Sequence, residues 1–578
     1  MALAIQVCCG RFLLLSGLIA LGLLASPCSA RDLFAPPAGI SPANVSLETV
    51  LSAARRADGS DGHFSTRVEK GRVTAWGLKG TFSVVESGQD YKVNTDLDAI
   101  AWERGRTIGQ LWRRNENGLV IALHDEARAE ADTRSVDDYT HYGSSQMRLL
   151  GEVAGPPAAY VVEATTEYGS PKWFFFDKGN ALLVRVEVPH NTSRNTYTYD
   201  DFRRTGSFQN AWHEHVTDGI KDNDWDFVTT SLKYNGPVTP ADTAMPDSNA
   251  SLLQFPAGSN VVQLPSKVTD AKGHTKIISV ENSGHDITAN GDMSTSVAVY
   301  TAGDAKVLVQ LTVGGRGYDF FLDSGASGIF MDSDLAQKLG LKSFGPVQRT
   351  PFGSWAPGYA VIPKLSAGAV SMNNVIVHTL PGWHDNSKVG SDVVGLVGFD
   401  FLANAVLSID YEKGVVTAVN PFFFVPPAEA YALPVTLDEG VPSIAVQIGQ
   451  TASHHFILDT GSNDSWLSKS FALAHPTDVK DQGRGVNADR IWLPWIQFET
   501  VRGGTFTARA TEVKNLTVSG VSLDDWLMLM DQTDAFELNN DDGLIGYDFL
   551  KFFTVYLDYP HSQVFLLPNN TAKARAAH

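Results

Sequence analysis

The feature that most constrains this fold is a unit that occurs twice in the second half of the chain. In each copy an apolar segment runs into an Asp-Ser/Thr-Gly turn, once at Asp323 and again at Asp459. A second block follows in each copy, at residues 395–402 and 543–550, and six of its eight positions are identical. Both blocks lead into another apolar segment that ends in Asp-Tyr. Two copies with matched landmarks predict two similar domains and not a solenoid, which needs at least three repeats.

The turn and the later block together resemble the retropepsin and pepsin clan of aspartic peptidases. In that clan an apolar strand ends in Asp-Ser/Thr-Gly, and an apolar-apolar-Gly element follows later in the chain. The resemblance covers about residues 296–567. The apolar-apolar-Gly elements of this chain are Leu396, Val397 and Gly398 in the first unit, and Leu544, Ile545 and Gly546 in the second. The resemblance implies two retropepsin-like acid-protease β-barrel units that face each other across a catalytic cleft with pseudo-two-fold symmetry.

The resemblance also implies that Asp323 and Asp459 form the catalytic pair of an aspartic endopeptidase that needs no cofactor. The chemistry requires the same arrangement, because hydrolysis without a metal or a thiol needs an activated water and an acid. Two carboxyl groups about 3 Å apart share one proton, since both cannot ionise at that separation. The two roles belong to the coupled pair, so neither role is assigned to one residue.

Four neighbours of this pair are expected to shape the two turns. Gly325 and Gly461 keep each turn slim enough for a substrate and for the carboxyl group of the other turn. Ser324 and Thr460 supply hydroxyl groups, and the resemblance implies that these bond across the interface and lock the turns together.

The two units differ at the next position, where Ala326 resembles the retroviral motif and Ser462 the pepsin motif. A hydroxyl group at Ser462 is able to donate to the carboxyl group of Asp459. Such a bond would lower the proton affinity of Asp459 relative to that of Asp323. We therefore expect Ser462 to make the pair unequal.

The region before the repeat has a different pattern, with short alternating runs between residues 62 and 235. Strand signals such as 159–165 recur about every ten residues and predict a β-meander. An N-capped amphipathic helix is predicted to begin after Ser46. The leading helix, the hairpin strands ending in Asp-Lys-Gly and the segment 197–206 resemble the periplasmic lipoprotein-carrier family. That family wraps a curved, incompletely closed β-sheet around a helical lid, and the resemblance covers about residues 44–250.

The predicted fold is mainly β, with an N-terminal curved β-sheet domain and a helix followed by the two tandem barrel units. A stretch rich in Pro, Ala, Asp, Ser and Asn breaks the rhythm of the strands near the end of the first domain. The expected boundaries are 1–30 for a signal peptide, 31–250 for the N-terminal β-domain, 251–295 for a linker with leading strands, 296–425 and 426–570 for the two retropepsin-like units, and 571–578 for a tail.

The first thirty residues have the features of a secretory signal peptide. Arg11 precedes an apolar run over residues 12–25, and small residues follow at 28–30. The run is shorter than the about 20 apolar residues of a membrane span, although an uncleaved anchor is the alternative. All three cysteines lie in this leader, so the mature chain would contain no disulfide and no thiol nucleophile. An exported protein without cysteines is typical of a bacterial periplasm or cell surface, and we expect no stable membrane span after cleavage.

The acidity of the chain restricts its partners. A net charge of -19 disfavours nucleic acid and anionic membranes, because clusters of Lys and Arg supply the affinity for both. A polypeptide is the expected substrate, and a monomer is the expected active form because one chain supplies both aspartates. The alternative function is a catalytically inert binding protein whose N-terminal domain carries an apolar ligand.

Two other motifs have some features of metal sites. His213 and His215 lie on one face of a predicted strand and could bind a metal, but the sequence offers no clear third ligand. Asp222 begins a run of acidic residues that starts like a calcium loop and then lacks the required Gly and closing Glu, as is typical of a polar turn. We therefore expect no metal.

Overall fold

A computed structural model of the protein describes residues 35–123, 136–165, 171–190, 193–248, 253–268, 275–281, 294–300, 307–346, 348–350, 353–355, 358–380, 393–480, 496–499, 505–531, 536, 541–570 and 572–573. The predicted signal peptide lies outside these residues. None of the helices in this described part of the chain combines the length and the apolar character that a membrane span requires. The chain divides into an N-terminal domain, mainly Ala25–Asn249, and a C-terminal domain, mainly Ala250–Ser343 and Tyr359–His578.

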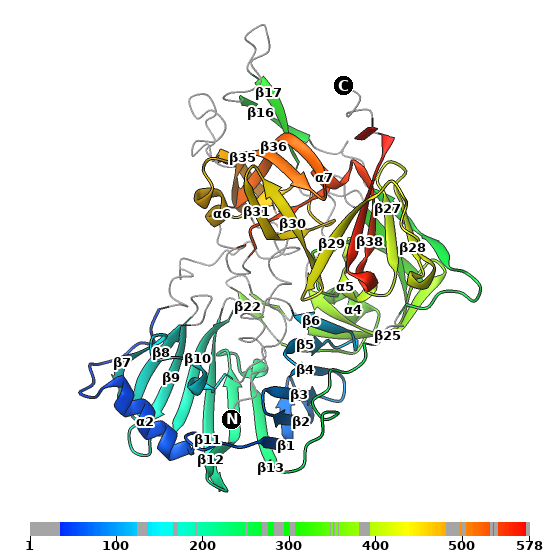
Figure 1. Ribbon diagram of the computed structural model, residues 1–578. Coiled ribbons are helices and arrows are strands. Elements are labelled where there is room, and N and C mark those ends of the chain that lie inside the picture. Colours follow the sequence, from blue (N-terminus) through cyan, green and yellow to red (C-terminus); the bar gives the residue numbers. More distant parts are fainter. Residues whose placement is uncertain are drawn as a thin grey trace. The chain divides into compact units, whose positions relative to one another are not determined.

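The N-terminal domain is one antiparallel sheet of thirteen strands, in the order β6-β5-β4-β3-β2-β1-β13-β12-β11-β10-β9-β8-β7. Two meanders build the sheet, and they join where β1 pairs with β13. The sheet is strongly curved (Figure 1), which confirms the predicted fold of this domain. Its strands are β1 (Thr66–Ala75), β2 (Leu78–Ser87), β3 (Asp90–Asp96), β4 (Ala101–Thr107), β5 (Gln110–Arg114), β6 (Val120–Leu123), β7 (Met147–Val153), β8 (Ala159–Thr165), β9 (Pro171–Asp177), β10 (Leu183–His190), β11 (Ser193–Thr205), β12 (Phe208–Thr217) and β13 (Trp225–Tyr234).

The predicted leading helix is α2 (Leu47–Asp58), and its two ends follow from local chemistry. The Ser46 side chain accepts a hydrogen bond from Thr49 N at 3.1 Å, which satisfies one of the free N–H groups of the first turn. Gly59 ends the helix in the left-handed conformation, which glycine adopts without steric cost. The buried side of the helix carries Val50 and Leu51, and the helix packs against β12.

Aromatic side chains form much of the core of this domain. Residues 173–176 are consecutive in β9, and each is at most 1% exposed. Because side chains alternate along a strand, four consecutive buried residues mean that both faces of β9 are covered. Phe174 and Phe176 contact Tyr139 on one face, whereas the other two aromatic residues pack with Ile40 on the opposite face.

The C-terminal domain contains two closed barrels of six strands with the same topology. In the first barrel the strands join in the order β18-β19-β26-β20-β25-β24, and β24 pairs back to β18. In the second the order is β30-β31-β37-β32-β36-β35, and β35 pairs back to β30. Taken in chain order, each strand of the first ring has a counterpart in the second. The two copies of the sequence repeat therefore fold into equivalent barrels.

Each barrel consists of six strands that come in the same chain order, although equivalent strands differ in length. The first barrel consists of β18 (Val307–Val313), β19 (Arg316–Leu322), β20 (Ile329–Asp332), β24 (Gly358–Ala367), β25 (Val370–Leu380) and β26 (Val393–Val397). The second consists of β30 (Val441–Ile448), β31 (Thr451–Leu458), β32 (Trp466–Leu467), β35 (Thr505–Val518), β36 (Val521–Asp531) and β37 (Gly543–Ile545). Short helices follow equivalent strands: α4 (Ser333–Lys338), α5 (Phe399–Leu402), α6 (Lys469–Ala474) and α7 (Tyr547–Leu550).

Six further strands pair in the order β14-β28-β27-β38-β39-β29, and β29 continues this sheet into β30 of the second barrel. At the centre β27 runs antiparallel to β38, and Ser408 lies opposite Tyr556. These residues are separated by 148 positions, as are the two second blocks of the repeat, so a pseudo-two-fold axis passes between them. The strands are β14 (Val261–Leu264), β27 (Val406–Asp410), β28 (Val415–Val419), β29 (Tyr431–Asp438), β38 (Phe553–Asp558) and β39 (Gln563–Pro568).

The remaining elements are short. They are β15 (Ser266–Val268), β16 (Thr275–Glu281), β17 (Ser294–Tyr300), β21 (Ser343–Phe344), β22 (Gln348–Thr350), β23 (Gly353–Trp355), β33 (Val479–Lys480), β34 (Ile496–Glu499), and the 3-10 turns η2 (Tyr139–His141), η3 (Lys221–Asn223), η6 (Pro421–Phe423) and η8 (Tyr559–His561).

Candidate active site

The two Asp-Ser/Thr-Gly turns begin where a barrel strand ends. Asp323 is the first residue after β19, and Asp459 is the first residue after β31. The apolar-apolar-Gly elements lie in and just after β26 and β37, which run parallel beside those strands. Backbone hydrogen bonds of 2.9 Å join Asp323 N to Val397 O and Asp459 N to Ile545 O. The second block of each repeat therefore holds the first residue of each turn in place.

Ser324 and Thr460 tie the two turns together through four hydrogen bonds. Ser324 N donates to Thr460 Oγ1 at 3.0 Å, and Thr460 N donates to Ser324 Oγ at 2.9 Å. Each hydroxyl group donates in turn to the residue before the other aspartate, Ser324 Oγ to Leu458 O at 2.7 Å and Thr460 Oγ1 to Leu322 O at 2.9 Å. Both side chains are buried, so these bonds satisfy polar groups that water cannot reach. The two turns are thus held as one unit.

Each carboxyl group is fixed by its own turn and lies against the glycine of the other turn. Gly325 N donates to Asp323 Oδ1 at 2.9 Å, and Gly461 N donates to Asp459 Oδ1 at 2.7 Å. A methyl group added at Gly325 would lie 2.8 Å from the carboxyl carbon of Asp459, and one at Gly461 would lie 2.6 Å from that of Asp323. Asp323 is 1% exposed and Asp459 is 0% exposed. Each carboxyl group is therefore buried against the opposite turn, at a position that only glycine leaves open.

The start of each short helix binds the backbone of the adjacent turn. Phe399 N donates to Ala326 O at 2.9 Å, and the equivalent bond in the second barrel joins Tyr547 N to Ser462 O at 2.9 Å. A Cβ atom at Gly398 would overlap the Ala326 carbonyl group, so the close approach requires glycine. The third residue of the apolar-apolar-Gly element thus allows the helix to reach the turn.

Ser462 does not make the bond predicted for it. Its hydroxyl group donates to Asp464 O at 2.8 Å, so its only hydrogen is not available to Asp459. A serine in a tight turn readily bonds a backbone group two residues away, and here that local bond replaces the contact with the carboxyl group. The prediction that Ser462 lowers the proton affinity of Asp459 through a direct bond is therefore wrong.

Two tyrosines that the motif does not mark also lie near the pair. Tyr411 follows β27 and Tyr559 follows β38, so they occupy equivalent positions in the repeat. Tyr559 Oη donates to Ser324 O at 3.2 Å. Burial, followed by the negative charges of Asp323 and Asp459, raises the pKa of Tyr559 well above its usual value. The repeated Asp-Tyr ending was the signal available in the sequence, but nothing in it shows where the two rings lie.

Residues 309–401 match the family model for aspartyl proteases. The chain therefore contains an aspartyl protease-like domain. No protein in the curated set matches the chain.

Several solved structures resemble parts of the chain. An aspartic proteinase from Irpex lacteus is 13% identical, with 46% of this chain and 96% of that chain covered and a TM-score of 0.29. A LolA superfamily protein from Nitrosomonas europaea is 15% identical, with 35% of this chain and 98% of that chain covered and a TM-score of 0.27. A DUF1329 family protein from Desulfovibrio piger is 13% identical, with 34% of this chain and 97% of that chain covered and a TM-score of 0.27.

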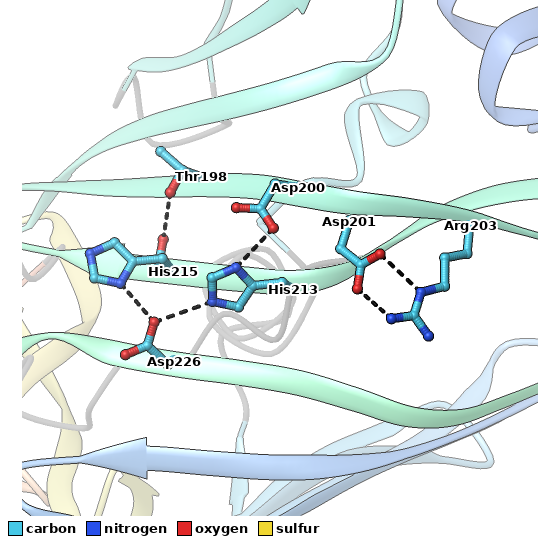
Figure 2. Close-up of polar contacts among 7 residues, drawn as sticks. All are labelled: Thr198, Asp200, Asp201, Arg203, His213, His215 and Asp226. Atoms are coloured by element: carbon cyan, nitrogen blue, oxygen red, sulfur yellow. Dashed lines mark hydrogen bonds and ion pairs between the residues drawn. The ribbon is translucent and has the colours of Figure 1, made fainter.

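His213 and His215 lie among carboxylates outside the protease-like domain (Figure 2). His213 Nδ1 lies 2.9 Å from Asp200 Oδ1, and its Nε2 lies 3.3 Å from Asp226 Oδ1. His215 Nδ1 lies 2.9 Å from the same oxygen of Asp226. Across the described ranges, no group of three His, Cys, Asp or Glu side chains has the arrangement of a metal site. The two histidines and these carboxyl groups form a hydrogen-bonded network, and Asp222 lies in the turn η3 before β13.

We expect the pKa of His213 to be higher than that of an ordinary histidine. Burial opposes the charged form, but hydrogen bonds to Asp200 and Asp226 outweigh it and raise the pKa. Because the folded-state pKa is raised, the stabilisation is fully present below the unfolded pKa of about 6.5 and is lost as pH rises through the folded pKa. An NMR titration of His213 should show this shift, and Asp200→Asn should reduce it. Asp222→Asn is the control, and an equal effect of both variants would contradict the assignment.

Proposed function

We propose that the protein is an aspartic endopeptidase in which Asp323 and Asp459 share one proton and activate a water molecule. The observation that carries this proposal is the contact of each carboxyl group with the glycine of the other turn. The reciprocal hydrogen bonds of Ser324 and Thr460 support it, because they hold the two carboxyl groups without help from a substrate. Two buried carboxyl groups that meet in this way cannot both ionise, so one proton is retained between them.

The shared proton allows acid and base catalysis by one pair of residues. The ionised carboxyl group takes a proton from water, and the water oxygen attacks the carbonyl carbon of the peptide bond. The protonated carboxyl group donates its proton to the carbonyl oxygen as the tetrahedral intermediate forms. The carboxyl group that took the proton from water then gives it to the nitrogen. As the C–N bond breaks and the amine leaves, the other carboxyl group takes a proton from a hydroxyl group of the intermediate, so the pair again holds one proton. Gly325 N and Gly461 N keep both carboxyl groups oriented throughout, because each donates to an Oδ1 atom.

We expect the enzyme to act on polypeptides outside the cytoplasm and as a monomer. The leader sequence supports export, as argued above, and a periplasmic or extracellular location follows from it. Both aspartates come from one chain, so their barrels are linked covalently, and β27 and β38 also pair by backbone hydrogen bonds. The second barrel is therefore always present beside the first at a high effective concentration.

The direct test is hydrolysis of casein by the purified protein from acidic to neutral pH, with peptide products identified by mass spectrometry. We expect cleavage, inhibition by pepstatin, and a rate per molecule that does not change on dilution, because no association step is needed. Absence of cleavage at every pH would contradict the proposal and favour the inert binding protein. A rate per molecule that falls steeply on dilution would instead mean that each site forms between two chains.

A further inference from the structure

One peptide unit of the first turn takes part in two hydrogen bonds that run in the same direction. Its carbonyl oxygen, Ser324 O, accepts from Tyr559 Oη at 3.2 Å. Its N–H group, Gly325 N, donates to Asp323 Oδ1 at 2.9 Å. Tyr559 is therefore connected to the Asp323 carboxyl group through a single amide. In such a chain each hydrogen bond polarises the next and strengthens it.

The Tyr559 hydroxyl group is well placed to remain a donor. The residue is 2% exposed and follows β38 in the second half of the repeat, yet it bonds to the turn of the first half. The centroid of its ring lies 6.3 Å from the ring centroid of Phe399, which belongs to the first half of the repeat. Burial and the charges of the two aspartates disfavour the phenolate, so the hydroxyl group keeps its proton at any pH at which the enzyme would work.

In the part of the chain that the structure describes, Tyr411 does not make the corresponding bond to the second turn. Tyr411 is the counterpart of Tyr559, is 8% exposed, and packs edge-on against Tyr547 with 5.3 Å between ring centroids. Its hydroxyl group is buried and has no hydrogen-bond partner among the described residues. Gly461 N still donates to Asp459 Oδ1, but its peptide unit accepts no hydrogen bond from Tyr411. The repeat supplies both tyrosines, but only one of them reaches a turn.

We propose that Tyr559 is a positioning residue that makes Asp323 the preferred anionic member of the pair. This inference rests on the proposed function, because it assigns the two roles within the same catalytic pair. A peptide unit polarised by Tyr559 is a better donor, and a stronger bond to the carboxylate lowers its proton affinity. The lengths of the two bonds favour the opposite assignment. The bond from Gly461 N to Asp459 Oδ1 is 2.7 Å, shorter than the 2.9 Å bond from Gly325 N to Asp323 Oδ1. Tyr559→Phe measures whether the polarised peptide unit at Asp323 outweighs the shorter bond at Asp459.

The test compares Tyr559→Phe with Tyr411→Phe, each of which removes one buried hydroxyl group and little volume. In Tyr559→Phe the acidic limb of the pH profile of kcat/KM should move to higher pH by about 0.2–0.6 pH units. A shift of this size corresponds to about a tenth to a third of the free energy of a charge-assisted hydrogen bond. In Tyr411→Phe the limb should stay in place. A merely structural role would change melting temperature or kcat without moving the limb, and that result would overturn the proposal.

A second measurement does not depend on activity. In protein labelled with carbon-13 at the aspartate carboxyl groups, the Asp323 signal is assigned from its loss in Asp323→Asn and is titrated by NMR. Its apparent pKa should rise in Tyr559→Phe and stay unchanged in Tyr411→Phe. An unchanged value in both variants would contradict the inference even if the enzyme cleaves casein. Failure of the wild-type protein to cleave casein would contradict the proposed function, whereas this titration would still decide the role of Tyr559.

Discussion

Replacing either Asp323 or Asp459 by Asn should lower kcat/KM for peptide hydrolysis by roughly 10⁴-fold or more, because the two residues work as one unit. An amide can neither take a proton from water nor share one with the remaining carboxyl group. The fold should survive, since Asn has the shape of Asp and its carbonyl oxygen can still accept from the glycine N–H group of its own turn. Steady-state kinetics on a fluorogenic peptide, together with thermal melts, would measure both effects.

The double variant and a surface variant complete this experiment. Asp323→Asn combined with Asp459→Asn should be no slower than the worse single variant, because the first change already disables the pair. Asp334→Asn, at an exposed position in α4, should behave like the wild type. Near-full activity in either single variant would show that the carboxyl groups do not share a proton.

Replacing Gly325 or Gly461 by Ala should have the next largest effect. The new methyl group would lie 2.8 Å or 2.6 Å from the carboxyl carbon of the opposite aspartate, closer than side-chain carbons pack in proteins. The carboxyl group must then move, and a displacement of about 1 Å in an active site costs on the order of 100-fold in rate. Overpacking a buried site should also reduce the free energy of unfolding by about 1–3 kcal/mol. Measurements of kcat/KM and of chemical unfolding test the two expectations separately.

Gly236→Ala is the matched control for these variants. A methyl group at Gly236 would meet no atom within 4 Å, so both activity and stability should stay near the wild-type values. If Gly325→Ala or Gly461→Ala kept wild-type kcat/KM, the two carboxyl groups would not lie against the opposite turns in solution. The proposed geometry of the pair would then be incorrect.

The residues of the two turns could be predicted because their determinants are local and occur twice. An apolar strand, a polar residue at its end and a glycine in the turn are all contiguous in sequence, and the later apolar-apolar-Gly element repeats with few changes. The structure places each of these elements beside its turn through the bonds of Asp323 N to Val397 O and Asp459 N to Ile545 O. The alternation of apolar residues likewise predicts the strands of the N-terminal sheet, since side chains alternate between the faces of a strand.

The pairing of distant strands was not predictable in the same way. Two-residue periodicity indicates which face of a strand is buried but does not identify its neighbour. In the N-terminal domain β1 pairs with β13, so the first and last strands of the sheet in sequence lie side by side. This pairing depends on the arrangement of all the strands of the sheet, which no short segment encodes. His213, Asp200 and Asp226 come together across β11, β12 and β13 for the same reason.

The sequence by itself determined which residues form the two turns and that the turns are nearly equivalent. Only the tertiary structure decided how they differ. It brings Tyr559 to Ser324 across 235 positions, leaves the equivalent Tyr411 hydroxyl group without a partner among the described residues, and directs the Ser462 hydroxyl group to Asp464. The physical reason is that a hydrogen bond depends on tenths of an ångström and on angle. Two barrels with non-identical cores set those positions independently, so similar sequence segments make unequal contacts.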